Sequence, residues 1–213
     1  LPVNVSLPTG AKAVDVALGI YHTCALLTNG SVMCWGDGTY GQLGAGGATT
    51  SSNTPVYTSA LGSSARTGVA IDAGVGHTCV HLDDSSVVCW GYNGWGGVGS
   101  GSFTDMFVPT FVTSLGSGSS TTATSISTGY GHTCAITNNG LLCWGKADAG
   151  QLGDGQTQYN RATPQTVGSF GAGTSAVNIT AGWQHTCALL SNGNLSCWGG
   201  EEFGALGPTT LSS

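Results

Sequence analysis

Cysteine and histidine, two residue types that could do chemistry, recur along the chain in one arrangement. His-Thr-Cys is followed, nine or ten residues after its cysteine, by Cys-Trp-Gly, and this arrangement occurs four times. The histidines are His22, His77, His132 and His185, and the paired cysteines are Cys24 with Cys34, Cys79 with Cys89, Cys134 with Cys143, and Cys187 with Cys197. These residues can form disulfides in an oxidising compartment, remain buried thiols in a reducing one, or bind a metal ion. The elements that hold each pair decide between these chemistries.

The segment between the two cysteines of a pair predicts a β-hairpin. In the first copy, short apolar runs flank Thr28, Asn29 and Gly30. A three-residue loop with Gly30 in the left-handed conformation then places Cys24 opposite Cys34. The second and fourth copies carry similar turn residues and the same spacing between their cysteines, so Cys79 is expected opposite Cys89 and Cys187 opposite Cys197.

The third hairpin is one residue shorter, and a two-residue turn at Asn138 and Asn139 again sets Cys134 opposite Cys143. Directly opposed residues of antiparallel strands lie within the Cα separation that a disulfide accepts. We therefore predict four cross-strand disulfides, each stabilising the fold by roughly 2.5–3 kcal/mol on the loop-entropy argument. A metal site and free core thiols are the weaker interpretations, because the spacing is that of paired strand positions and no Cys-x-x-Cys occurs.

The four copies are evenly spaced, with 55, 55 and 53 residues between successive first cysteines, which indicates a repeat architecture. An alternating segment such as 13–19 precedes each hairpin, and a proline-led segment such as 54–62 follows it. Each unit thus holds four strands, the content of one propeller blade. The predicted fold is all-β: a complete, partial or open β-propeller in one domain, with units at about residues 11–62, 67–116, 121–171 and 174–213.

The two ends of the chain are complementary in sequence. Residues 1–10 resemble the proline-led segment, and residue 213 comes just before the next such segment is due. Three arrangements follow: a small ring closed by its own first strand, an excerpt of a longer propeller, or subunits whose residues 1–10 complete a neighbour's blade head to tail. Because the chain starts at Leu1 without an initiator methionine, we expect either a removed leader or an excerpt.

Charged residues are unusually scarce. Four Lys and Arg and ten Asp and Glu make up 7% of the chain, against about 25% in typical proteins, and the net charge is −6. Nucleic-acid binding is disfavoured because it needs phosphate-neutralising cations. No apolar run approaches 18 residues, so no membrane span is predicted.

Glycine-rich corners follow each Cys-Trp-Gly, at residues 41–44, 96–99, 150–153 and 204–207. His-Thr-Cys-Ala-Leu, Asn-Gly, Cys-Trp-Gly and Gly-Gln-Leu-Gly at a period near fifty resemble the repeat of the regulator of chromosome condensation family, over the whole chain. The resemblance implies a β-propeller in which aromatic and glycine positions pack blade on blade. Two features depart from the family pattern: its propellers usually have seven blades, and the founding member's repeats carry no paired cysteines.

Asn-x-Ser/Thr sequons occur four times, at Asn4, Asn29, Asn178 and Asn194. In a secreted protein each is a candidate N-glycosylation site. Covalent glycans would supply the hydration that the few charges do not. Together with the predicted disulfides, the sequons favour an extracellular or cell-surface location.

The repeated histidines and the tryptophans of Cys-Trp-Gly occupy one position in every unit. A catalytic or metal site needs residues in different roles brought to one place. Regular repetition instead favours a repeated structural hydrogen bond for the histidines and packing between blades, rather than a sugar platform, for the tryptophans. We therefore predict no catalytic, cofactor-binding or metal-binding residues.

A few residues stand outside this pattern. Trp95 lies in a corner and is the best candidate for an exposed contact. His81, the fifth histidine, stands near positions that are Leu or Ile in the other units, and its role is open. The corners that carry Asp37 and Lys146 to Asp148 are interpreted as solvated turns.

The sequence as a whole favours a non-enzymatic structural or interaction module, a building block of a cell-surface or fibrous assembly. Its expected partners are proteins, including copies of itself joined head to tail. The alternative is a secreted propeller that binds a ligand, as an adhesin, a lectin-like protein or an enzyme inhibitor. Guanine nucleotide exchange, the activity of the founding family member, is more remote, because cysteines and sequons fit a different compartment.

Overall fold

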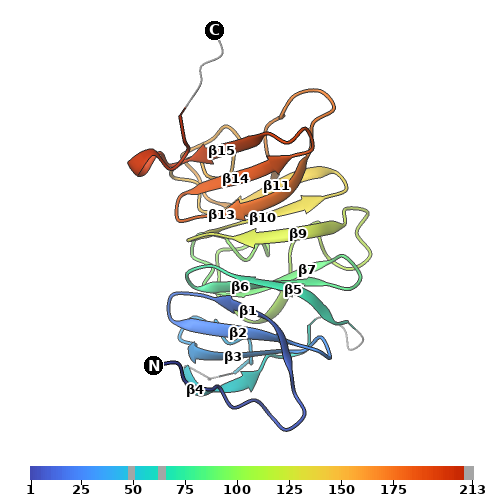
Figure 1. Ribbon diagram of the computed structural model, residues 1–213, viewed down its shortest axis with the longest axis vertical. Coiled ribbons are helices and arrows are strands. Elements are labelled where there is room, and N and C mark those ends of the chain that lie inside the picture. The colour runs from blue at the N-terminus through green and yellow to red at the C-terminus, as the bar shows by residue number, and fades with distance from the viewer. Residues whose placement is uncertain (48–50, 62–65, 209–213) are drawn as a thin grey trace.

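The computed structural model describes residues 1–47, 51–61 and 66–208. Four antiparallel sheets follow one another along the longest axis of the molecule (Figure 1). The N-terminus lies near the first sheet, and the fourth sheet lies at the opposite end of the molecule (Figure 1). The sheets are the blades of an open β-propeller, as predicted.

Each blade is an up-and-down sheet whose strands pair in chain order. The first blade comprises β1 (Ala13–Leu18), β2 (His22–Leu27), β3 (Val32–Asp37) and β4 (Ser51–Tyr57), and the second β5 (Gly68–Ala73), β6 (His77–Leu82), β7 (Val87–Gly91) and β8 (Met106–Phe111). The third comprises β9 (Ala123–Thr128), β10 (His132–Thr137), β11 (Gly140–Gly145) and β12 (Arg161–Thr166), and the fourth β13 (Ala176–Ala181), β14 (His185–Leu190) and β15 (Leu195–Gly199). A short 3₁₀ turn, η1 (Glu202–Gly204), follows the last strand.

The predicted hairpins and disulfides are confirmed. The two cysteines of every pair face each other in the strand register, and in the first hairpin Gly30 closes the turn with a φ of 75°. All four pairs form disulfides with Cα atoms 4.1 Å apart, and the described residues contain no free cysteine. The bonds join Cys24 with Cys34, Cys79 with Cys89, Cys134 with Cys143, and Cys187 with Cys197.

The glycine of each Cys-Trp-Gly is required by the backbone. Gly36, Gly91, Gly145 and Gly199 have φ values of 102°, 103°, 103° and 112°. A Cβ atom added at Gly36 would lie 2.3 Å from the carbonyl oxygen of Tyr21, the residue just before β2. The chain bends here, and the pairing of β3 with β4 shifts register between Cys34 and Gly36. A side chain at this position would therefore push two strands apart.

The hydrophobic core lies between neighbouring blades. One cluster joins Cys24, Leu26 and Val32 of the first blade to Val80 and Trp90 of the second. Equivalent clusters join the second blade to the third and the third to the fourth. Each blade is therefore stabilised by its neighbours, as expected for a repeat protein.

A ring closed by the chain's own first segment is not what the structure shows. Residues 1–10 form no strand, and the fourth sheet contains three strands in the described part of the chain. The inner strands β1, β5, β9 and β13 contact one another in sequence, whereas the first and fourth sheets lie at opposite ends of the molecule (Figure 1). In the described structure, residues 1–10 do not pair with the last blade of the same chain. Completion of a neighbour's blade stays a prediction.

Candidate functional site

The repeated histidines connect one blade to the next. His22 Nε2 lies 2.8 Å from Thr78 Oγ1 of the second blade, and the same contact recurs at the two following boundaries, from His77 to Thr133 at 2.8 Å and from His132 to Thr186 at 2.9 Å. The predicted repeated hydrogen bond is confirmed at these three boundaries. His185 of the last blade has no such threonine in the described structure.

Burial keeps these imidazoles neutral. It lowers the pKa of His22 and of His77 to about 4, and that of His132 to about 3. The hydroxyl of Thr133 donates to the carbonyl of Gly97 and so accepts from His77 Nε2. A neutral, donating imidazole is a structural group, not an acid–base catalyst at neutral pH.

The tryptophans add a second contact at each boundary. Trp90, Trp144 and Trp198 donate their indole N–H groups to backbone carbonyls in the preceding blade's corner, at Gln42, Gly97 and Gln151, over 2.8–2.9 Å. Their predicted role in packing between blades is confirmed. Among the described residues no corner precedes the first blade, and the indole N–H of Trp35 has no hydrogen-bond partner there.

The outer face of the first blade leaves apolar side chains in solvent. Val16 is 58% exposed, although its counterpart Ile71 in the second blade is 7% exposed. Leu18 is likewise exposed, whereas its counterpart Ala73 is buried. We call this surface the first end face; it includes Val16, Leu18, Thr23 and Trp35.

The outer face of the fourth blade also exposes an apolar side chain whose counterpart in the third blade is buried. Leu195 is 74% exposed, although its counterpart Leu141 in the third blade is 4% exposed. A hollow of about 240 Å³ beside it is lined by Leu189, Leu195 and Cys187. The fourth disulfide is partly exposed, whereas the other three are fully buried. This surface, with His185 and Ala205, is the last end face.

Five aromatic rings form a continuous row across the blades. Tyr40, Tyr92, Trp95, Tyr130 and Trp183 contact one another in that order, with ring centroids 4.2–5.3 Å apart. Trp95, predicted to be an exposed contact, is half-buried in the middle of this row. The exposed ends of the row are Tyr40 and Trp183.

Lys146 is part of this row, and its interpretation as a solvated turn residue is wrong. Its ammonium group lies 5.6 Å from the ring centroid of Trp95 and 5.3 Å from that of Tyr130, and it forms a 2.7 Å ion pair with Asp148. The lysine side chain is mostly buried while Asp148 stays exposed. The rings thus hold a cation by cation–π attraction.

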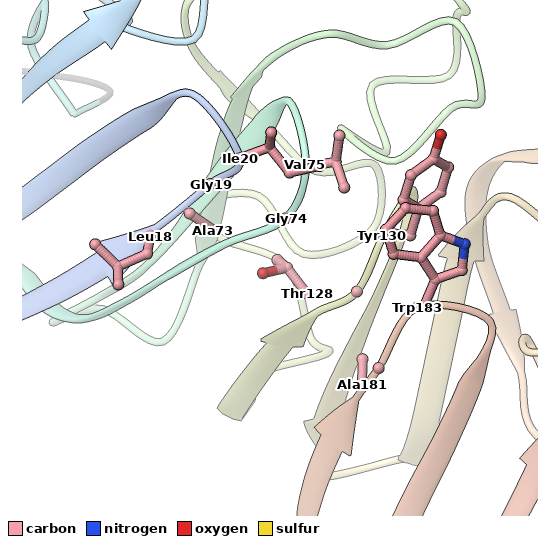
Figure 2. Close-up of a pocket in the computed structure, with 12 residues that line it drawn as sticks. Leu18, Gly19, Ile20, Ala73, Gly74, Val75, Thr128, Tyr130, Ala181 and Trp183 are labelled. Atoms are coloured by element: carbon pink, nitrogen blue, oxygen red, sulfur yellow. The ribbon is translucent and has the colours of Figure 1, made fainter. Parts of the chain in front are cut away.

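A groove of about 250 Å³ runs along the ends of the inner strands (Figure 2). Glycines and small apolar residues line it, with Tyr130 and Trp183 at one edge and Leu18 and Ile20 at the other (Figure 2). Its backbone amides bond blade to blade, for example Val75 N–H to the carbonyl of Tyr130. The groove therefore offers few polar groups to a ligand.

Two sequence profiles, both described as the regulator of chromosome condensation (RCC1) repeat, match most of the chain. One matches residues 13–42, 123–151 and 176–205, and the other residues 29–81, 84–136 and 138–189. The chain belongs to the RCC1 repeat family.

Relatives with RCC1 repeats are longer proteins. The ultraviolet-B receptor UVR8 of Arabidopsis thaliana is 32% identical over 210 residues, which cover 97% of this chain and 45% of UVR8. The probable E3 ubiquitin-protein ligase HERC4 of Homo sapiens is 32% identical over 216 residues, which cover 100% of this chain and 20% of HERC4. The chain thus spans less than half the length of these relatives.

Solved structures share the propeller fold. Human WBSCR16 matches with a TM-score of 0.78 and 21% identity, over 91% of this chain and 50% of WBSCR16. Yeast RCC1 (Prp20), in a crystal structure with Kap60, matches with a TM-score of 0.78 and 22% identity, over 95% of this chain and 47% of the other. At this identity the likeness establishes the fold alone.

The remaining sites predicted from the sequence lie apart from one another. All four sequon asparagines are exposed, at Asn4, Asn29, Asn178 and Asn194, and their glycosylation stays a prediction. His81 is partly buried in β6, and burial lowers its pKa. In the described residues, no group of three or more His, Cys, Asp or Glu side chains could hold a metal ion, and no helix has the length and apolar character to cross a bilayer.

Sequence reasoning missed the aromatic row as a unit. Tyr40 and Trp95 occupy the same repeat position, and so do Tyr130 and Trp183, so comparison of the units could have revealed it. The contact with Lys146 gave no such signal, because this position is Asp37, Tyr92 and Gly200 in the other units.

Proposed function

We propose that this RCC1-repeat chain is a non-enzymatic interaction module that binds further blades at its two end faces, as a building block of an extracellular or cell-surface assembly. The observation that carries this proposal is the pair of apolar end faces, each exposed where the equivalent residues of inner blades are buried. The occupant we propose is the matching blade of a second copy of the chain, joined head to tail.

The polar groups of the two end faces match one another. At each inner boundary a histidine meets a threonine, and a corner carbonyl accepts from a tryptophan. The last end face presents His185 and the corner carbonyl of Ala205, while the first presents Thr23 and Trp35. A second copy docked in the geometry of an inner boundary would pair all four groups, and it would cover Val16 and Leu195.

Related propellers are described as protein-binding. The yeast RCC1 structure contains Kap60, and a second yeast structure is described with binding properties to Gsp1p and histones. Those partners belong to those proteins, yet they support an interaction role for this fold.

An extracellular location is supported by the four disulfides and by the exposure of the four sequons. Intact mass of protein from its own source, before and after reduction and treatment with an N-glycosidase, tests this part of the proposal. Oxidised cysteines and glycan mass are expected. Eight reduced cysteines and an unmodified mass would contradict it.

The assembly is tested by light scattering after size-exclusion chromatography. The wild-type mass should rise with concentration above the 21.2 kDa of one chain. Leu195→Asp on the last end face and Val16→Asp on the first should each keep the protein monomeric. Val69→Asp, an exposed site on the second blade, is the matched control and should leave assembly unchanged.

Mixing the two monomeric variants distinguishes head-to-tail contact from other association. L195D keeps an intact first end face and V16D an intact last end face, so the mixture should form a dimer that grows no further. A mixture that stays monomeric, or a wild-type chain that stays monomeric at all concentrations while folded, would overturn the proposal.

A further inference from the structure

The cation held by the aromatic row sits at a position that repeats at every blade boundary. Two residues form this position. One comes just before the first glycine of a blade's glycine-rich corner, and the other comes just after Trp-Gly in the following blade. Between the first and second blades, Tyr40 and Tyr92 occupy it and pack edge to face. Between the second and third blades, Trp95 and Lys146 occupy it.

At the boundary between the third and fourth blades both residues are small. Ala149 stands in place of Trp95 and Gly200 in place of Lys146, and a Cβ added at Gly200 would lie 3.4 Å from that of Ala149. Trp183, the neighbour that corresponds to Tyr130, consequently leaves 59% of its surface in solvent. One face of this indole stacks on Tyr130 at 4.2 Å, and the rest is open.

The open side of Trp183 faces a pocket of about 310 Å³. Trp183, Gly200, Glu202 and Phe203 line it, together with Gln184 and with His185 and Ala205 of the last end face. Phe203 is fully exposed and has a φ of 60°, a left-handed conformation that an aromatic residue rarely adopts. The pocket thus offers two aromatic rings and a carboxylate, the same groups that surround Lys146.

The distribution of charge on the chain indicates which kind of group would fit the pocket. Lys146, Arg161 and Arg66 are paired with Asp148, Asp154 and Asp84 respectively. Lys12, the fourth cation, lies just before β1 in the first blade. Glu201 and Glu202 have no ion pair in the described residues, and the net charge is −6. The pocket is therefore complementary to a positive group from another molecule.

We propose that the pocket formed by Trp183, Gly200, Glu202 and Phe203 binds a lysine or arginine side chain of a basic segment of a partner protein. The bound cation would take the place that Lys146 occupies one boundary earlier. In a second copy docked head to tail, the residue after Trp-Gly is Asp37, which would add an acidic side chain beside Phe203, so the partner recognised here is a different protein. The proposal does not depend on self-association.

Peptide titration followed by calorimetry tests the pocket, at a concentration where light scattering shows single chains. The probes are blocked eight-residue Gly-Ser peptides that carry two Arg, two Lys or two Glu residues. We expect the Arg and Lys peptides to bind and the Glu peptide not to bind. Gly200→Lys, which places a lysine of the chain itself in the pocket, should weaken binding at least tenfold.

Two further variants distinguish binding in the pocket from a general attraction of basic peptides to an acidic chain. Glu202→Gln should weaken binding about three- to tenfold, and Trp183→Ala about tenfold. Glu201→Gln is the matched control, because Glu201 carries the same charge outside the pocket lining. Equal losses in E201Q and E202Q, or undiminished binding by folded G200K, would overturn the proposal. Because every variant is measured as a single chain, these outcomes are independent of whether the chain assembles head to tail.

Discussion

The imidazole Nε2 of His132 lies 2.9 Å from the hydroxyl of Thr186, across the boundary between the third and fourth blades. The hydroxyl in turn donates to the carbonyl of Gln151 in the third blade's corner, over 2.8 Å. This relay repeats the one that joins His77, Thr133 and Gly97 one boundary earlier. Blade-to-blade stability in this propeller thus depends on buried neutral histidines.

Acid should therefore destabilise the fold. The pKa of His22 and of His77 falls from an ordinary 6.5 to about 4 in the folded protein, because burial disfavours the charged ring. The unfolded chain binds more protons between these values, so the free energy of unfolding should fall as pH drops from about 6.5 to 4. The full effect is about 3 kcal/mol for each histidine.

Urea unfolding at pH 7, 6 and 5 measures this slope. His132→Gln keeps a neutral donor and cannot be protonated, so its pH dependence should be shallower than that of the wild type. A free energy of unfolding that is constant or greater at pH 5 would contradict the role of buried neutral imidazoles.

The loss of stability caused by a tryptophan-to-phenylalanine substitution should depend on which blade carries the tryptophan. Trp144→Phe removes the N–H donated to the Gly97 carbonyl and leaves that buried acceptor one partner short, which should cost about 1–3 kcal/mol. Trp35→Phe is the matched control, because the indole of Trp35 has no acceptor within the described chain. The loss of unfolding free energy in Trp35→Phe, measured by chemical denaturation, should be clearly smaller than that in Trp144→Phe. Equal losses would argue against the hydrogen bond.

The four disulfides should differ in their resistance to reduction. Three are fully buried between blades, whereas the bond between Cys187 and Cys197 is partly exposed on the last end face. Because exchange requires access of the attacking thiolate, brief reduction followed by alkylation and peptide mapping should label Cys187 and Cys197 before Cys79 and Cys89. In urea the four pairs should react at similar rates, and preferential labelling of any buried pair in the folded protein would contradict this expectation.

The sequence predicts those features that depend on residues close together in the chain. Cys24 and Cys34 lie on the two strands of one hairpin, so the turn at Gly30 alone determines their pairing. The Cys-Trp-Gly glycine and the repeated histidine were visible because every unit repeats them. Local geometry and repetition thus suffice for the blade and for its disulfide.

The aromatic row could not be predicted in the same way. The environment of Lys146 is created by Trp95, which reaches it only when the second and third blades pack together. In isolation, a lysine between Trp-Gly and a glycine corner has the pattern of a solvated turn. Likewise, residues 1–10 have the sequence of a blade strand, but they form no strand in the described structure.

Salt and the charge of Glu202 should affect the two proposed interactions in opposite directions. Head-to-tail docking brings together two chains of net charge −6 and places Asp37 of one copy near Glu202 of the other. Added salt and Glu202→Gln should both relieve this repulsion and increase the mass measured by light scattering. Binding of the Arg peptide depends on attraction to the same carboxylate, so both changes should weaken it. If salt and E202Q moved assembly and peptide binding in the same direction, Glu202 would not be the group that distinguishes a basic partner from a second copy.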